Sequence, residues 1–372
     1  MVVVGRSAWP VPLTASGSYE YAAAVAHRLG GRYDVVVPAA GSEDPRRECA
    51  GPVVVHRAHG RTGITSAVST LFTVRSLLRD ARASAVLVSS DPFGVLVCEL
   101  ARRGTDRPHV FQVQGEVVRP GPEYGSRWRR WVLARVVQFG LRRATAVRAV
   151  SGSIAAQASE ITRRPVQVVS TRVDVSQFHP AQAMEQPGGA VVVASLIPGK
   201  MVDTVLRAWA RLPPLLQAQG LDVVGGGVEE LALRALTDRL GLGACVHFHG
   251  RLPHAEVAQV LRRRLVLLLA SRSEGRPRVV LEACASGLPV VLSDIAAHRE
   301  LAELAGEAAT LAPIGDVSAW SAAISNVLTL PTGEWRRRSE RARRTAEEHF
   351  DFDENADAFA QLVRYAAGMV PQ

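Results

Sequence analysis

The chain has 372 residues, of which 47% are hydrophobic and 21% are charged, a balance typical of folded globular proteins rather than disordered ones. Its formal net charge of +9 comes with only 5% aromatic residues and no zinc-finger or RNA-binding motif, so nucleic acid is not expected as a partner. Four scattered cysteines argue against a disulfide frame, and no apolar run approaches the ~18 residues of a membrane span, so we expect a cytoplasmic protein.

Short apolar runs alternate with longer helical patterns along both halves of the chain. In the first half we expect strands at 35–38, 85–89, 110–113, 146–150 and 166–169, and helices at 19–29, 66–81, 93–103 and 127–143. In the second half we expect strands, again with helices between them, at 191–194, 221–224, 246–249, 265–269 and 290–293. Alternation of this kind predicts two parallel sheets covered by helices on both faces, an α/β fold.

The length and a polar segment rich in Pro and Gly at 182–189 predict two domains joined by a linker. We expect an N-terminal domain over 1–180 and a C-terminal domain over 190–350, followed by a terminal helix within 351–372.

The helical pattern at 127–143 carries an aromatic stripe, formed by Trp128, Val132, Val136 and Phe139, with arginines beside it. A helix packed on a sheet with a solvated basic face has this pattern, and so does a helix lying on a lipid surface. Packing is the interpretation we favour. Peripheral contact with the inner face of a membrane is the alternative.

Lys200 is the single lysine among 44 basic residues. Arginine has replaced lysine everywhere else, so this position is expected to need a compact ammonium that a planar guanidinium cannot replace. It lies in a loop between an apolar run and a helical pattern.

Two carboxylates, Glu274 and Glu282, lie eight positions apart in the segment 271–291. The first precedes a Gly-Arg-Pro turn and the second falls in the opening turns of the next helix. Glu274, Lys200 and the glycines at 225–227 all follow predicted strands, and ligands of parallel sheets bind beyond the carboxyl ends of strands. Helix N-termini there favour a phosphate, so a phosphorylated sugar would suit this set of residues.

The segment 271–291 resembles the signature of the family 4 glycosyltransferases, in which two glutamates are separated by seven residues. The resemblance continues at 173–180, 221–231 and 240–250, and Gly17 with Glu20 resembles the glycine-rich loop that opens the first domain. It implies a GT-B fold, in which two Rossmann-like domains face each other across a cleft. It also implies a retaining enzyme with no obligatory metal and no other cofactor, whose first domain binds the acceptor and whose second binds a nucleotide-diphosphate sugar.

The resemblance also implies roles for individual residues. Lys200, Glu274 and Gln114 would be catalytic, and Glu282 would hold the ribose of the donor. The remaining donor-binding positions would be Gly275, Arg276, Pro277, Arg278, Ser195, Gly17, Gly250, Arg251 and Leu252. The terminal helix, at about 355–369, is expected to cross back to the first domain. The pair Asp351 and Asp353 is interpreted as a chance match to a metal-binding pattern.

The sequence departs from the family at two of these positions. Ser195 stands where the family usually has a second phosphate-binding arginine. Gln114 stands where it usually has a histidine, and an amide cannot carry a proton or a positive charge.

The predicted function is transfer of a hexose-type sugar from a nucleotide-diphosphate sugar to a hydroxyl of a small metabolite, a glycan or a lipid-linked acceptor. Two alternatives stay open. One is a sugar-nucleotide epimerase of the same architecture, and the other is a non-catalytic protein that binds nucleotide sugars.

Overall fold

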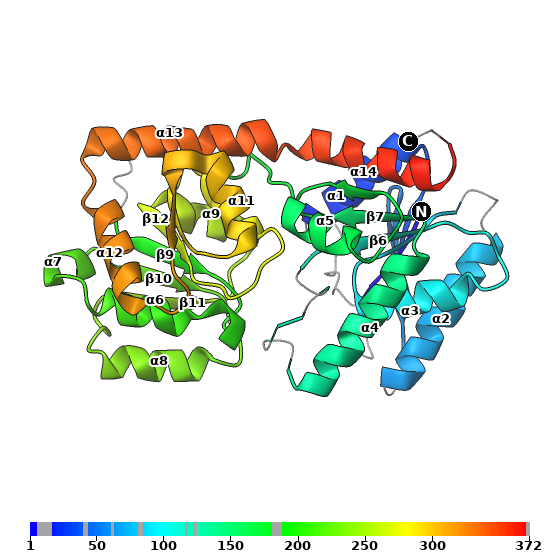
Figure 1. Ribbon diagram of the computed structural model, residues 1–372, viewed down its shortest axis with the longest axis horizontal. Coiled ribbons are helices and arrows are strands. Elements are labelled where there is room, and N and C mark those ends of the chain that lie inside the picture. The colour runs from blue at the N-terminus through cyan, green and yellow to red at the C-terminus, as the bar shows by residue number, and fades with distance from the viewer. Residues whose placement is uncertain are drawn as a thin grey trace. The chain divides into compact units, whose positions relative to one another are not determined.

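The computed structural model describes residues 1–5, 17–39, 44–60, 63–80, 85–115, 118, 120–121, 125–180 and 188–369. The chain forms two compact units (Figure 1). Unit 1 comprises Met1–Ser170 with Phe352–Gln372, and unit 2 comprises Thr171–Asp351. Most of the expected linker at 182–189 lies outside the described residues.

Unit 1 contains, in its described residues, one sheet of eight strands in the order β3-β4-β2-β1-β5-β6-β7-β8. All pairs are parallel except β3 with β4. The strands are β1 (Val2–Val4), β2 (Tyr33–Pro38), β3 (Arg47–Ala50), β4 (Val53–Ala58), β5 (Leu87–Ser89), β6 (His109–Val113), β7 (Ala146–Ala149) and β8 (Val166–Val168).

Helices cover both faces of this sheet, so its central strands bury apolar residues on both sides. One face packs against α1 (Gly17–Leu29) and α14 (Phe352–Ala366), and the other against α2 (Gly63–Asp80), α3 (Pro92–Ala101), α4 (Arg127–Arg143) and α5 (Gly152–Ser159). Among the described residues, no helix is long and apolar enough to cross a membrane.

Unit 2 contains a fully parallel sheet of six strands in its described residues, in the order β11-β10-β9-β12-β13-β14. The strands are β9 (Ala190–Val193), β10 (Leu221–Val224), β11 (Val246–Gly250), β12 (Val266–Leu269), β13 (Val290–Ser293) and β14 (Ala309–Ala312). The helices are α6 (Val202–Trp209), α7 (Pro214–Gln217), α8 (Glu230–Arg239), α9 (His254–Arg262), α10 (Arg278–Ala285), α11 (Ala296–Ala305), α12 (Val317–Leu328) and α13 (Thr332–His349), with 3-10 turns η3 (Pro198–Lys200) and η4 (Gly306–Ala308).

The boundary between the units differs from the expected one at residue 180. Val173 and Phe178 are buried in the core of unit 2, and the Val173 amide donates to the Phe350 carbonyl at 3.2 Å. Residues 171–180 therefore belong to the second unit and not to the first.

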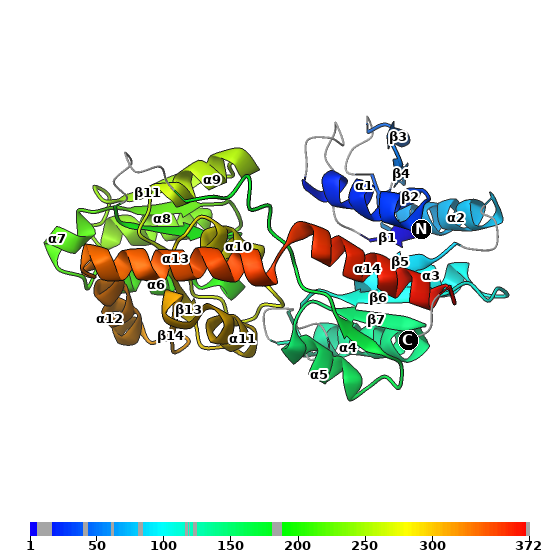
Figure 2. The same ribbon diagram turned by 90° about the horizontal axis from the view of Figure 1, so that it is seen from above.

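The terminal helix α14 packs against α1 within unit 1 (Figure 2). Tyr21 donates its hydroxyl hydrogen to Asn355 at 3.0 Å, and Arg28 forms ion pairs of 2.6 Å with both Asp353 and Asp357. Asp353, the second aspartate of the Asp351-x-Asp353 pattern, thus forms an ion pair that holds α14 against α1.

Helix α4 packs on the sheet with a largely exposed set of arginines, as favoured, but most of the predicted aromatic stripe is not the packed face. The helix buries Val137, Gly140 and Leu141 against the sheet, and a Cβ on Gly140 would lie 2.7 Å from the Val95 side chain. This close approach selects the buried face. As a result Trp128 and Phe139 of the stripe face outward, 65% and 43% exposed, while Val136 is partly buried against the core.

Each sheet has a point at which its strand order reverses. In unit 1 the point lies between β1 and β5, and in unit 2 it lies between β9 and β12, which pair directly in parallel. The loops that leave two such strands turn to opposite faces of the sheet, which leaves a crevice at their carboxyl ends where ligands bind.

Candidate functional site

The loops after β9 and β12 bring the predicted cation and the predicted carboxylate together. Lys200 ends the turn η3 that follows β9, and Glu274 lies in the loop between β12 and α10. The Lys200 ammonium donates to Glu274 Oε1, and Ser271 Oγ donates to the same oxygen at 2.6 Å. Glu274 is only 11% exposed and Lys200 23% exposed, so the pair is partly shielded from water.

Backbone hydrogen bonds hold the loops around this pair. The Arg272 amide donates to the Gly199 carbonyl at 2.9 Å, which joins the loop after β12 to the loop after β9. The Leu196 amide donates to the Gly226 carbonyl at 3.1 Å, which adds the loop after β10. Three loops from adjacent strands therefore form one connected frame.

Two of the three consecutive glycines after β10, Gly225 and Gly227, are required because the loops after β9 and β10 lie very close together. Gly225 has a φ of +133°, and a Cβ there would lie 1.8 Å from the Ala194 carbonyl oxygen. A Cβ on Gly227 would lie 2.2 Å from the Leu196 carbonyl oxygen. Only glycine allows the two loops to approach this closely.

Met201, directly after Lys200, has a left-handed backbone with φ 47° and ψ 41°. Residues with a Cβ adopt this conformation at a cost on the order of 1–3 kcal/mol, and such strain concentrates at functional sites. The Met201 side chain is buried in the core of unit 2, which holds the strained residue in place.

His298 is a residue of this site that the sequence analysis missed. It lies in the first turn of α11 and is fully buried, and its Nδ1–H donates to the Ser293 carbonyl at 2.8 Å. Ser293 Oγ donates in turn to the Ser271 carbonyl, which connects His298 to the loop of Glu274. Burial lowers the pKa of His298, with Glu274 and Lys200 close enough to add opposing electrostatic effects. Its Nε2 has no hydrogen-bond partner among the described residues and is therefore an acceptor that a ligand hydroxyl could use.

Glu282 is the buried carboxylate of α10. Its Oε1 lies 2.9 Å from His254 Nε2, within hydrogen-bond distance, and Arg278 Nε lies 3.9 Å from the same oxygen. The His254 ring packs edge-on against Phe178 at 5.0 Å, so the imidazole is held in place. Both contacts are made by Oε1, and the other carboxylate oxygen of Glu282, Oε2, has no hydrogen bond in the described part of the chain.

The two arginines that flank Pro277 differ in their surroundings. Arg276 is buried, pairs with Glu300 at 2.5 Å and lies over the Phe350 ring at 5.7 Å, and burial lowers its pKa. Arg278 is half exposed at the start of α10. Arg278 is therefore better placed than Arg276 to meet a diphosphate. Gly275 and Pro277 are buried in the turn between Glu274 and α10.

The other predicted donor-binding residues of unit 2 lie at the same edge of the sheet. Ser195 is exposed just beyond β9, and Gly250, which ends β11, has a φ of +67° and accepts from the Gly225 amide at 2.7 Å. Arg251 is exposed, and Leu252 packs partly against the core.

Two predicted residues lie in unit 1. Gln114 is exposed at the carboxyl end of β6, and Gly17 begins α1. The loop that precedes Gly17 lies outside the described residues. In the described ranges, no three His, Cys, Asp or Glu side chains form a group that could hold a metal ion.

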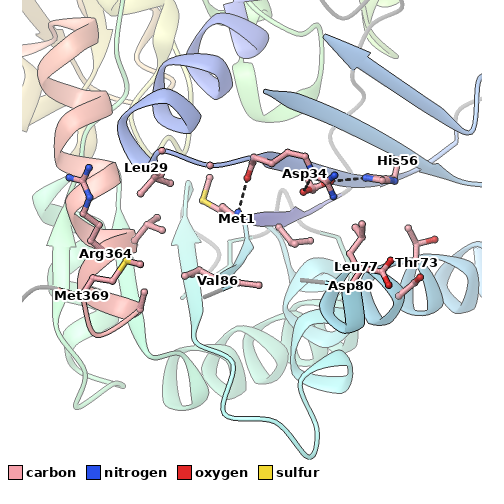
Figure 3. A pocket seen from close by; sticks show the side chains of 18 of the residues that line it. Met1, Leu29, Asp34, His56, Thr73, Leu77, Asp80, Val86, Arg364 and Met369 are labelled. Carbon is pink, nitrogen blue, oxygen red and sulfur yellow. Dashed lines mark hydrogen bonds and ion pairs between the residues drawn. The ribbon is translucent and has the colours of Figure 1, made fainter. Parts of the chain in front are cut away.

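A hollow of about 830 Å³ in unit 1 lies at the opposite edge of its sheet, around Met1, Asp34 and Val86 at the amino ends of β1, β2 and β5 (Figure 3). Asp34 accepts from Arg32 at 2.7 Å and pairs with His56 at 2.9 Å. The buried charge of Asp34 is thus paired within the protein. The hollow also lies at the amino ends of its strands, whereas the site in unit 2 lies at the carboxyl ends.

Comparison with solved structures defines the class of fold. The chain is similar to sucrose-phosphate synthase from Thermosynechococcus elongatus, with 19% identity, a TM-score of 0.83 and 99% of both chains covered. It is also similar to Anabaena HepE in complex with UDP and glucose, with 19% identity, a TM-score of 0.77, and 98% of this chain and 99% of that chain covered. These likenesses show a GT-B fold built from two Rossmann-like units.

Family models identify the family. The model of the glycosyl transferases group 1 matches residues 177–348, and that of the glycosyl transferase 4-like domain matches residues 16–173. The chain belongs to the family 4 glycosyltransferases. It is 30% identical over 213 residues to D-inositol 3-phosphate glycosyltransferase of Mycobacterium tuberculosis. That match covers 55% of this chain and 44% of the relative, so the chain spans less than half the length of the curated relatives it matches.

Proposed function

We propose that the protein is a retaining glycosyltransferase that moves a hexose-type sugar from a nucleotide-diphosphate sugar to a hydroxyl acceptor. The observation that carries the proposal is the Lys200–Glu274 pair at the point where the strand order of unit 2 reverses. A parallel sheet binds its ligand at this point, and the pair offers one cation for phosphate and one carboxylate for sugar hydroxyls.

The donor would be held by unit 2. Glu282 would accept hydrogen bonds from the two vicinal hydroxyls of the ribose, with Oε2 as the oxygen that has no hydrogen bond in the described chain. Glu274 would accept from hydroxyls of the transferred sugar. Lys200 and Arg278 would face the diphosphate.

Transition-state stabilisation would come from the charge of the protein's own side chains. As the bond between the sugar and the diphosphate breaks, negative charge grows on the leaving group. A positioned ammonium in a partly shielded site stabilises that charge, and electrostatic stabilisation of this kind usually contributes more to catalysis than any other single effect. Lys200 would supply it, and no metal would be obligatory.

The choice of nucleotide and sugar for the donor rests only on proteins of similar fold. HepE has been solved with UDP-glucose, and its fold covers 99% of this chain at a TM-score of 0.76. A UDP-hexose is therefore the first donor to test. The acceptor would be bound by unit 1, where Gln114 offers an amide at the carboxyl end of β6.

A panel of nucleotide sugars tests the proposal. A bound donor stabilises the native state by mass action, so the correct donor should raise the midpoint of thermal unfolding. With that donor and a mixture of hydroxyl acceptors, the wild-type protein should release free nucleoside diphosphate and form a glycoside of unchanged anomeric configuration. Failure of every nucleotide sugar to stabilise the protein would overturn the proposal.

One observation favours a second function. Gln114 cannot carry a proton, and Ser195 cannot neutralise a phosphate, so a protein that binds nucleotide sugars without transferring them is the alternative. The same panel separates the two, since such a protein would bind a donor but neither transfer nor hydrolyse it.

A further inference from the structure

One face of unit 1 carries exposed apolar side chains on three neighbouring helices. Helix α3 packs against both α2 and α4, so the three helices form one layer over the sheet (Figure 1). Their exposed apolar residues, which are 37% to 78% exposed, are Ile64, Val68 and Phe72 on α2, Leu96 and Leu100 on α3, and Trp128, Trp131, Val132 and Phe139 on α4. We call this set the α2–α4 surface.

The spacing of these residues shows that they belong to stripes and not to scattered positions. On α2 they recur every four residues, and on α3 they are again four apart. On α4, Trp131 and Val132 lie three and four residues after Trp128, and Phe139 lies seven residues after Val132. Soluble proteins rarely expose contiguous apolar patches of this kind, and such patches mark interaction sites.

Helix α4 contributes charge of one sign to the α2–α4 surface. Helix α4 contains six arginines and no acidic residue, and all but Arg130 are exposed. The single acid of α3, Glu99, is buried and pairs with Arg102 at 2.9 Å and His109 at 2.8 Å. Arg143, the last residue of α4, also pairs with Glu99 at 3.3 Å. Among the described residues, the acids of α3 and α4 therefore neutralise one of the six arginines of α4 and leave the other five without an acidic partner on these helices.

The aromatic and cationic side chains are also paired in space. Arg129 lies over the Trp128 ring at 5.8 Å, and Arg135 lies over the Trp131 ring at 5.4 Å. Both tryptophans are more than 60% exposed. An indole beside a guanidinium fits the interface of a bilayer, because the ring can enter the headgroup region while the cation contacts lipid phosphate.

We propose that the α2–α4 surface docks on an anionic lipid bilayer. A second copy of the chain is a poorer occupant, since a symmetric dimer through this face would bring the arginines of both α4 helices together. The inference goes beyond the reaction proposed above and does not depend on it. Lipid contact could fail while donor binding by unit 2 still holds, and the reverse is equally true.

Flotation of the full chain with lipid vesicles tests the proposal. We expect the protein to float with vesicles that contain about 30% anionic phospholipid and not with neutral vesicles, because attraction to anionic lipid supplies about a fivefold gain in affinity per arginine. We expect this binding to fall at least about tenfold between about 0.05 M and about 0.5 M salt, since salt screens exposed charges.

Paired variants separate the two components of the surface. Trp128→Ser with Trp131→Ser should weaken binding by about tenfold or more by removing the apolar anchors. The control is Leu231→Ser, which removes an 83% exposed apolar residue from α8 in unit 2. Arg129→Gln with Arg135→Gln should weaken binding about 25-fold, the product of two arginines. Its control is Arg336→Gln with Arg337→Gln, two exposed arginines of α13.

Three outcomes would overturn the proposal. They are no flotation with anionic vesicles at low salt, equal losses in the surface variants and their controls, and binding to polyglutamate without binding to vesicles. The last result would assign the surface to an acidic protein partner.

Discussion

The charges of Lys200 and Glu274 offset each other in the structure, and a bound diphosphate would compete with Glu274 for the ammonium. We expect Lys200→Ala to lower the rate of sugar transfer ~10²-fold or more, the range for loss of one preorganised charge. Lys200→Arg should also be impaired, because a planar guanidinium does not occupy the position of a compact ammonium. Steady-state kinetics measures both.

Arg207→Ala is the matched control for this prediction. Arg207 is a half-exposed cation of α6, and its nearest acid is Asp203 at 3.9 Å. Its loss should leave transfer nearly unchanged. Activity of both Lys200 variants within about twofold of wild type would remove the lysine from the mechanism, since one preorganised charge is worth far more.

A variant of His298 tests whether this residue contacts the transferred sugar or only supports the fold. His298→Asn can keep a donor toward the Ser293 carbonyl but removes the buried Nε2 acceptor. A sugar hydroxyl that loses its hydrogen-bond acceptor weakens the free energy of binding by about 1–3 kcal/mol. Affinity for the nucleotide sugar should therefore fall about tenfold, while affinity for the bare nucleoside diphosphate stays unchanged. Titration calorimetry with both ligands measures this difference. If both affinities fell together, His298 would be supporting the fold and not contacting sugar.

At the scale of elements, the glycines after β10 decide whether the site can form. Gly225→Ala should destabilise unit 2 strongly, because the new methyl group would overlap the Ala194 carbonyl and the φ of +133° excludes alanine. We expect a loss of at least about 3 kcal/mol in the free energy of unfolding.

Gly333→Ala in α13 is the contrasting variant. A Cβ there meets nothing within 4 Å, and alanine favours helix, so this variant should be neutral or stabilised by up to about 1 kcal/mol. Urea unfolding of the two variants gives the comparison. Similar stabilities would contradict the close approach of the loops after β9 and β10.

The elements show what a single sequence can predict. The sequence predicts the strands at 221–224 and 290–293 with correct ends, because short, mainly apolar runs bounded by Gly, Pro or Asp are typical of buried strands. Four strands, β1, β3, β4 and β14, were not predicted, although β1 and β4 each contain three consecutive valines. β3 is an exposed antiparallel edge strand and β14 contains little β-branched sequence, so neither has an apolar run to detect.

The site could be predicted in part for similar reasons. Lys200, Glu274 and Glu282 could be selected by residue type and spacing, and the structure brings the first two into contact. His298 is one of ten histidines, and its relation to Ser293 and to the loop of Glu274 arises only when β12 and β13 pair. The outward face of α4 also depends on tertiary packing at Gly140, because periodicity predicts an amphipathic helix without saying which face is buried.

At the scale of the whole molecule, buried titratable groups predict how stability depends on pH. Burial by itself would raise the pKa of Glu99, but hydrogen bonds from His109 and Arg102 outweigh it and lower that pKa from 4.5 to about 2. The folded state therefore holds this carboxylate ionised while the unfolded state takes up a proton below pH 4.5. The stability it contributes should be present above pH 4.5 and should be lost as the pH falls toward 2.

Histidines extend this dependence to milder acid. Burial lowers the pKa of both His109 and His298 below 6.5, so the unfolded state binds more protons than the folded state as the pH falls through 6.5. Stability should decrease from about pH 6.5 downward. Hydrogen exchange can follow the two units separately at several pH values. Stability in either unit that is unchanged between about pH 7 and about pH 5 would contradict the buried neutral histidines.

Unit 2 is proposed to bind a nucleotide sugar with one carboxylate on the ribose and the other on the transferred sugar. Titration calorimetry of UDP and UDP-glucose with wild type, Glu282→Gln and Glu274→Gln tests this arrangement. We expect Glu282→Gln to weaken binding of both ligands at least about tenfold, the loss of a charged hydrogen-bond acceptor. We expect Glu274→Gln to leave UDP binding nearly unchanged and to weaken only UDP-glucose. Equal losses for both variants with UDP alone would contradict the assignment of the two carboxylates.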